Sequence, residues 1–141
     1  MLKARLIHPD ILSALAAAGH GSTVLIADGN YPVATGASLA ATRVFLNLSP
    51  DILRVTDVLQ VIVEAIPIEA ATLMSPDDAS HPEPAAHRAL AAVLPDGIDV
   101  RRVPRTAFYE LARSPDVALV IASGDLRTYA NVLLTIGVVT G

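Results

Sequence analysis

Apolar residues along the chain gather in short runs separated by polar turns, and these runs predict alternating helices and strands. Residues 23–27, TVLIA, form an apolar run without polar alternation, as expected of a strand buried on both faces. Residues 9–18 before it have the apolar spacing of a short helix that ends at Gly19. Further strands are predicted over residues 42–48, 68–74, 98–103, 117–123 and 131–139, and further helices over 49–66, 85–94 and 106–113.

The longest predicted helix, residues 49–66, has favourable residue types at its start. Ser49 suits the N-cap, Pro50 the first helical position and Asp51 the first turn. Because helices alternate with apolar strands, we expect a layered α/β fold, with helices flanking a largely buried sheet and one domain over residues 1–141. The apolar stripe of the long helix comprises Ile52, Val55, Leu59, Ile62 and Ile66.

The composition of the chain favours association between copies. Of its 141 residues, 52% are hydrophobic but only 4% are aromatic, and the mean hydropathy is +0.52. A chain of this length has much surface for its volume, so an apolar excess is easier to bury if some of it lies between subunits. We therefore expect a homo-oligomer.

Several classes of protein are disfavoured by the sequence. Without cysteine there is no disulfide, thiol nucleophile or thiolate metal site, and the net charge of -4 gives no reason to expect a nucleic-acid partner. Polar residues and a proline interrupt the longest apolar stretch, residues 58–74, so neither a membrane span nor a membrane partner is predicted. The first ten residues lack the apolar core of a secretion signal, and we expect a cytoplasmic protein.

Titratable residues stand at both ends of the predicted strand 23–27. His20 precedes it and Asp28 follows it. Each has a purely structural explanation, since an imidazolium interacts favourably with the last carbonyls of a helix and aspartate before Gly29 forms turns. However, ligands of α/β sheets bind beyond the C-terminal ends of strands, which is where Asp28 falls. The two residues are therefore a candidate site.

Further polar candidates stand at the start of the last strand and of the last helix. Tyr129 and Asn131 are two residues apart, so on extended backbone their hydroxyl and amide project to one side and could bind sugar hydroxyls. The alternative is a tyrosine packed at a strand end, with Asn131 completing a turn. Arg105 stands near the start of the last predicted helix.

Other polar motifs are explained without chemistry. The segment GHG lacks the third glycine of a dinucleotide fingerprint, and no serine has the G-x-S-x-G frame of a nucleophile elbow. Asp77, Asp78 and His81 lie in a proline-rich segment that predicts a solvated loop rather than a metal site. His87 follows Glu83 by four residues, which predicts an exposed helical pair.

Taken together, the segments GHGSTVLIAD, NYP, FYELA and GDLRTYANVLLTIGV resemble the family of ribose pyranases and fucose mutarotases, over nearly the whole chain. The resemblance implies an α/β subunit that assembles into rings, often decamers. It also implies interconversion of anomers or ring forms of a free monosaccharide, with neither cofactor nor metal.

The resemblance also implies roles for individual residues. The catalytic histidine of the family falls on His20, the substrate-binding aspartate on Asp28, and the Tyr-x-Asn motif on Tyr129 and Asn131. A basic binding position falls on Arg105, where the ribose branch has histidine, and with the following TAFYE this favours L-fucose as substrate. D-ribose pyranase and a non-catalytic monosaccharide-binding protein of the same fold are the alternatives.

The proposed reaction suits these residue types. Opening a cyclic hemiacetal needs one proton given to the ring oxygen and one removed from the anomeric hydroxyl, and closure on the other face reverses both transfers. Histidine, with an ordinary pKa of about 6.5, can donate and accept protons near neutrality. We expect His20 to transfer protons, and Asp28 either to orient His20 or to hold a sugar hydroxyl.

Overall fold

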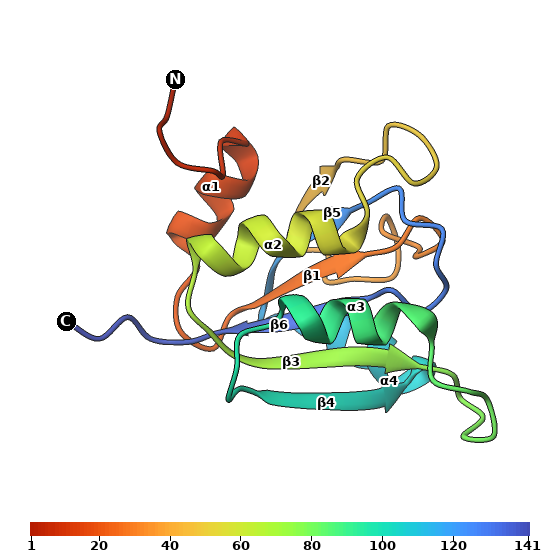
Figure 1. The fold of residues 1–141 in the computed structure, drawn as a ribbon. Helices are drawn as coiled ribbons and strands as arrows, with labels where there is room; N and C mark the ends of the chain where they lie inside the picture. The colour runs from red at the N-terminus through yellow and green to blue at the C-terminus, as the bar shows by residue number, and fades with distance from the viewer.

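A six-stranded mixed sheet forms the centre of the computed structural model, which describes residues 1–141 (Figure 1). The strands stand in the order β2 (Thr42–Phe45), β5 (Val117–Ala122), β1 (Thr23–Ala27), β6 (Val132–Ile136), β3 (Ile68–Ser75) and β4 (Asp99–Pro104). All strands run parallel except β6, which lies antiparallel between β1 and β3.

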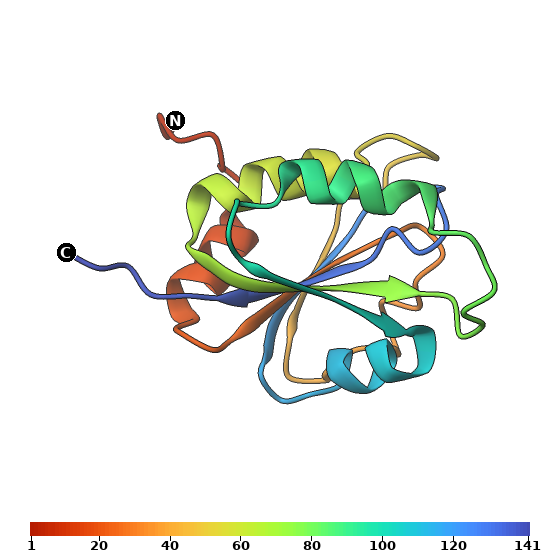
Figure 2. The same cartoon turned by 60° about the horizontal axis from the view of Figure 1, so that its bottom comes forward.

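Helices cover both faces of the sheet, as Figure 2 shows with α2 (Val55–Ala65) and α3 (Ala85–Val93) above it and α4 (Arg105–Ala112) below. The cluster under the first three helices contains Val24 and Ile26 of β1, whereas Leu25 and Ala27 pack on the side of α4. Because alternate residues of β1 serve the two cores, the predicted double burial of this strand is confirmed. The remaining helix is α1 (Pro9–Ala17), and no helix combines the length and the apolar composition that a membrane span requires.

The predicted α/β fold is confirmed, and nearly all elements lie where the apolar runs place them. The largest difference is the long helix, predicted over residues 49–66, which begins only at Val55. The preceding residues make an isolated β-bridge between Ser49 and Ile52, and Asp51 and Leu53 have positive φ angles of 57°. The predicted N-cap at Ser49 is therefore wrong.

Hydrogen bonds to a distant loop explain why the helix starts late. The Asp51 N–H donates to the Gly124 carbonyl at 2.7 Å, and the Gly124 N–H donates to the Leu53 carbonyl at 2.9 Å. The first helical N–H, of Val55, then donates to the Asp125 carboxylate at 3.1 Å. A carboxylate far away in sequence thus satisfies one of the free donors at the helix start, which local capping patterns cannot reveal.

His87 is fully buried, so the prediction of an exposed pair with Glu83 is wrong. Its Nε2–H donates to the Met74 carbonyl at 2.8 Å, and its Nδ1 lies 3.9 Å from the Glu83 carboxylate. An i,i+4 spacing places two residues on the same side of a helix but does not say which way that side faces. Here α3 turns His87 toward β3.

Burial lowers the pKa of His87, so we expect the free energy of unfolding to decrease in acid. Below about pH 6.5 the unfolded chain protonates this histidine while the folded protein resists, so the free energy of unfolding falls as pH falls. We expect urea unfolding at pH 7.5 and 5.5 to show a smaller decline for His87→Gln than for the wild type. The exposed His81→Gln is the control, and an equal decline in all three proteins would contradict this account.

Candidate functional site

Four of the five predicted site residues meet at one edge of the sheet. Strands β1, β3 and β4 end at this edge and β6 begins there, because β6 runs the opposite way. Asp28 follows β1, Arg105 follows β4, and Tyr129 and Asn131 precede β6. They line a cavity of about 160 Å³ together with Asn30, Tyr31, Met74, Tyr109 and Thr128.

Asp28 and Asn131 form a reciprocal buried pair across the strands β1 and β6. The Asn131 Nδ2 donates to the Asp28 carboxylate at 2.9 Å, and the Asp28 N–H donates to the Asn131 Oδ1 at 2.8 Å. The second carboxylate oxygen accepts the Asn30 N–H at 3.0 Å, which is the turn interaction that the sequence predicts. Asp28 and Asn131 are only 4% and 2% exposed, so their orientation is fixed before a ligand arrives.

The environment of Asp28 changes its acidity. Burial raises the pKa of its carboxyl, although hydrogen bonds from the Asn30 N–H and the Asn131 amide oppose the shift. A carboxylate with a raised pKa is a stronger base than an exposed one. Asp28 is therefore suited to accept a hydrogen bond, or a proton, from a hydroxyl group in the cavity.

Tyr129 reaches the cavity from a loop held by a buried ion pair. Its backbone has a φ of 61°, which is uncommon for a residue other than glycine. Earlier in the loop, the fully buried Asp125 accepts from the Arg127 guanidinium at 2.6 and 2.9 Å and caps α2. Although burial by itself would raise the pKa of Asp125, these donors lower it. No sequence pattern singles out Asp125, because a charged pair two residues apart is typical of an ordinary exposed turn.

Arg105 is the first residue of α4 and lies at the rim of the cavity, with its side chain 53% exposed. Its guanidinium pairs with Asp77 at 3.2 Å. Asp77 is exposed, as predicted for the loop, but it is held in place rather than freely solvated.

His20 lies at the opposite edge of the sheet from the other four residues. Its Nε2 is 3.0 Å from the Glu69 carboxylate, and its side chain is 59% exposed. The five residues of β1 lie between His20 and Asp28. At about 3.3 Å per residue they span roughly 16 Å. The hypothesis that Asp28 orients His20 is therefore wrong within one chain.

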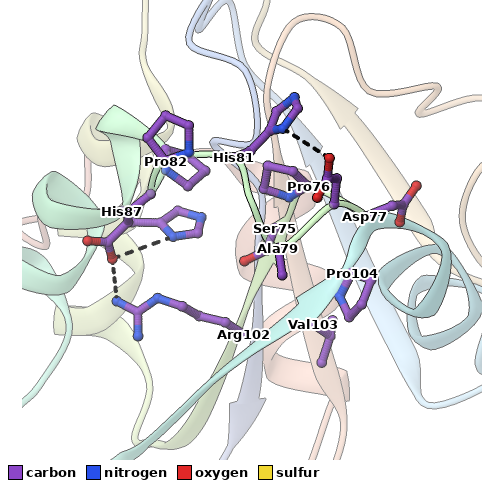
Figure 3. A pocket seen from close by; sticks show the side chains of 13 residues that line it. Ser75, Pro76, Asp77, Ala79, His81, Pro82, His87, Arg102, Val103 and Pro104 are labelled. Carbon is purple, nitrogen blue, oxygen red and sulfur yellow. Dashed lines mark hydrogen bonds and ion pairs between the residues drawn. The ribbon is translucent and has the colours of Figure 1, made fainter.

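Two other cavities adjoin this region. One of about 190 Å³ shares Asp28 and Tyr31 with the first and also contains Phe45, Asn47 and Ser123. The largest, about 540 Å³, is formed by residues 75–84 and the end of β4, and it contains none of the five predicted residues (Figure 3). No group of three or more carboxylate or imidazole side chains is arranged to hold a metal ion.

Comparison with known proteins gives this site its context. The model of the RbsD / FucU transport protein family matches residues 1–139. The chain belongs to this family. It is 30% identical to the D-ribose pyranase of Variovorax paradoxus, and the match covers 98% of both chains.

Solved structures of RbsD / FucU proteins have the same fold. The RbsD of Bacillus subtilis complexed with D-ribose is 25% identical, with a TM-score of 0.82 and coverage of 99% of this chain and 100% of the other. The fucose mutarotase of Streptococcus pneumoniae in complex with L-fucose is also 25% identical, with a TM-score of 0.80 and the same coverage. The predicted family resemblance is thus confirmed, and the relatives are sugar pyranases and mutarotases, which are isomerases.

Proposed function

We propose that the protein is a mutarotase that interconverts the anomers of a free monosaccharide, preferentially L-fucose, without a cofactor. The observation that carries the proposal is the cavity in which the buried Asp28–Asn131 pair, Tyr129 and the Arg105 guanidinium converge. These groups offer a carboxylate acceptor, an amide, a hydroxyl and a cationic donor, which together suit a ligand rich in hydroxyl groups. The names of the relatives support the same reaction class.

In the proposed reaction the cavity holds the sugar while protons move at its anomeric centre. A proton is given to the ring oxygen and the anomeric hydroxyl loses one, so that the bond between the ring oxygen and the anomeric carbon breaks and a carbonyl forms. Rotation about the adjacent carbon–carbon bond presents the other face of the carbonyl, and closure returns both protons. Asp28 holds a sugar hydroxyl, and Arg105 and Tyr129 bind further oxygens.

The proposed proton donor, His20, must come from a second copy of the chain, because one chain keeps it at the far edge from Asp28. Contact between the His20 edge of one copy and the Asp28 edge of the next joins two different surfaces, and such contacts form a ring when the rotation between neighbours closes on itself. Exposed apolar side chains occur at both edges: Leu48 and Leu126 line a groove with Gly29, and Val138 follows β6 on the side of His20. We therefore propose a ring-shaped homo-oligomer such as a decamer.

The preference for fucose depends on Arg105. A guanidinium at the rim provides several hydrogen-bond donors, whereas the histidine of the ribose branch provides at most two. The alternative, D-ribose pyranase, has support from the names of several relatives. The alternative that is not an enzyme is a protein of the same fold that binds a monosaccharide without catalysing its exchange.

Saturation-transfer NMR with purified protein tests the proposal. We expect the exchange rate between the α and β anomers to rise with protein concentration, most strongly for L-fucose. Faster exchange between pyranose and furanose forms of ribose than between fucose anomers would favour the alternative enzyme. Saturable binding without faster exchange would leave a binding protein, and absence of both for every sugar would overturn the proposal.

A further inference from the structure

The orientation of Arg105 depends on a residue outside the sugar cavity, by which we mean the cavity of about 160 Å³ that Asp28, Arg105, Tyr129 and Asn131 line. The side chain is half exposed, and a long exposed side chain of this kind populates many rotamers unless another group holds it. The Asp77 carboxylate lies 3.2 Å from both the Nε and an Nη atom of Arg105. Both nitrogens face the same carboxylate oxygen, Oδ2, so this charge-assisted contact holds one edge of the guanidinium toward Asp77.

Asp77 is itself held at the start of α4. Its other oxygen accepts the Thr106 N–H at 3.2 Å and lies 3.5 Å from the Thr106 hydroxyl. The N-cap residue of this helix, Pro104, offers no side-chain cap, so Asp77 supplies an acceptor that the helix start needs. Figure 3 draws the largest cavity, of about 540 Å³, and shows Asp77 beside the start of α4, on the side of that cavity away from His87 and Arg102.

Asp77 therefore links two parts of the molecule. One proline separates Asp77 from the end of β3, and Asp77 is the second residue of the loop 76–84, which borders the largest cavity. The Thr106 N–H and the Arg105 guanidinium hold the pKa of Asp77 below its usual range, so the carboxylate stays charged at neutral pH.

We propose that Asp77 is a positioning residue that holds the Arg105 guanidinium in the orientation that binds the sugar. This inference rests on the proposed function. Asp77 does not line the sugar cavity and acts through Arg105, so its loss weakens sugar binding in the ground state and the transition state alike.

The variant Asp77→Asn separates this role from a structural one. Asparagine keeps an oxygen for the Thr106 N–H but turns an uncharged amide toward Arg105. We expect the KM for anomer exchange to rise about two- to fivefold, the range that loss of an exposed ion pair allows, with kcat nearly unchanged. The wild-type KM should also rise with added NaCl, whereas the KM of the variant should depend on salt much less.

Asp78→Asn is the matched control, because it removes the same charge from the next residue of the same loop. Asp78 contacts Ser80 and His81 and makes no contact with Arg105. We expect its KM and its melting temperature to equal those of the wild type. Equal KM values for Asp77→Asn and Asp78→Asn would overturn the role of Asp77.

A double-mutant cycle with Arg105→Gln tests whether Asp77 acts through Arg105. We expect Asp77→Asn to weaken sugar binding in the wild-type background and to have no further effect in the Arg105→Gln background. Equal effects in both backgrounds would overturn the inference. The cycle is evaluated from dissociation constants measured by NMR titration with L-fucose. It can therefore be completed even for variants that exchange anomers slowly.

The two proposals fail in different ways. A wild-type protein that accelerates exchange of no sugar overturns the proposed enzyme, while the titration still reads the coupling between Asp77 and Arg105. A wild-type protein that binds no sugar overturns both. An active wild type with an unchanged Asp77→Asn variant overturns the Asp77 inference alone.

Discussion

Replacing His20 by alanine is expected to slow anomer exchange by about a hundred- to ten-thousand-fold, the usual contribution of a positioned proton donor. The fold should survive, because the imidazole is largely exposed and its single ion-pair partner is Glu69. An exposed ion pair of this kind contributes only about 0–1 kcal/mol to the free energy of unfolding. Saturation-transfer NMR and urea unfolding measure the two effects on the same samples.

The control for this variant is His81→Ala, which removes another exposed histidine paired with an aspartate. We expect it to exchange anomers at the wild-type rate. If His20→Ala also exchanged at that rate, His20 would have no part in the mechanism.

Mixing two inactive variants tests whether a site combines residues from two chains. In a ring assembled at random from equal amounts of His20→Ala and Asp28→Ala subunits, about a quarter of the contacts between neighbours unite an intact His20 with an intact Asp28. We therefore expect co-expression to restore roughly a quarter of the wild-type activity per site. Activity that stays at the level of the separate variants would contradict the shared site.

The second large effect is expected for Asn131→Asp, which turns the buried amide into a carboxylate. The new oxygen would replace the Nδ2 donor that lies 2.9 Å from the Asp28 carboxylate. Two buried carboxylates at this separation cannot both ionise without a large cost, so they share one proton and the pKa of the pair rises.

The sign of the resulting pH dependence follows from the raised pKa. Above about pH 4 the unfolded chain releases both protons, whereas the folded protein retains one, so the free energy of unfolding falls as pH rises. We expect Asn131→Asp to be less stable than the wild type at pH 8 by about 1–3 kcal/mol or more, and closer to it at pH 5. Exchange should also slow, because a protonated Asp28 is a weaker acceptor for a sugar hydroxyl.

Urea unfolding at both pH values measures this effect, with Asn47→Asp as the control. Asn47 is exposed, so the same chemical change there should leave the difference between the two pH values as in the wild type. A variant at position 131 that kept wild-type stability at pH 8 would show that the amide is not needed to balance the buried charge.

Most of the fold could be predicted because apolar spacing reports burial directly. The run TVLIA predicted β1 to the residue, since neither face of that strand reaches water. The start of α2 could not be predicted in this way. Ser49, Pro50 and Asp51 have good local signals for a helix start, but hydrogen bonds to Gly124 hold their segment in another conformation.

Within the site, local sequence was informative about residue type and poor about contacts. The turn interaction of Asp28 with the Asn30 N–H is local and was predicted. The contact between Arg105 and Asp77 joins the start of α4 to a loop residue 28 positions earlier, and nothing in the spacing of either segment indicates it. His87 shows the same limit, because its burial depends on how α3 packs.

By itself, therefore, the sequence determined a buried strand with a titratable residue at each end, an α/β arrangement around it, and the residue types of the proposed sugar site. Only the tertiary structure decided which of these residues meet. Because β6 runs antiparallel to β1, Tyr129 and Asn131 at its start lie beside Asp28 at the end of β1. The length of β1 keeps His20 at the other edge of the sheet. The physical reason is that periodicity and turns depend on neighbouring residues, whereas a site depends on the order and direction in which distant strands pair.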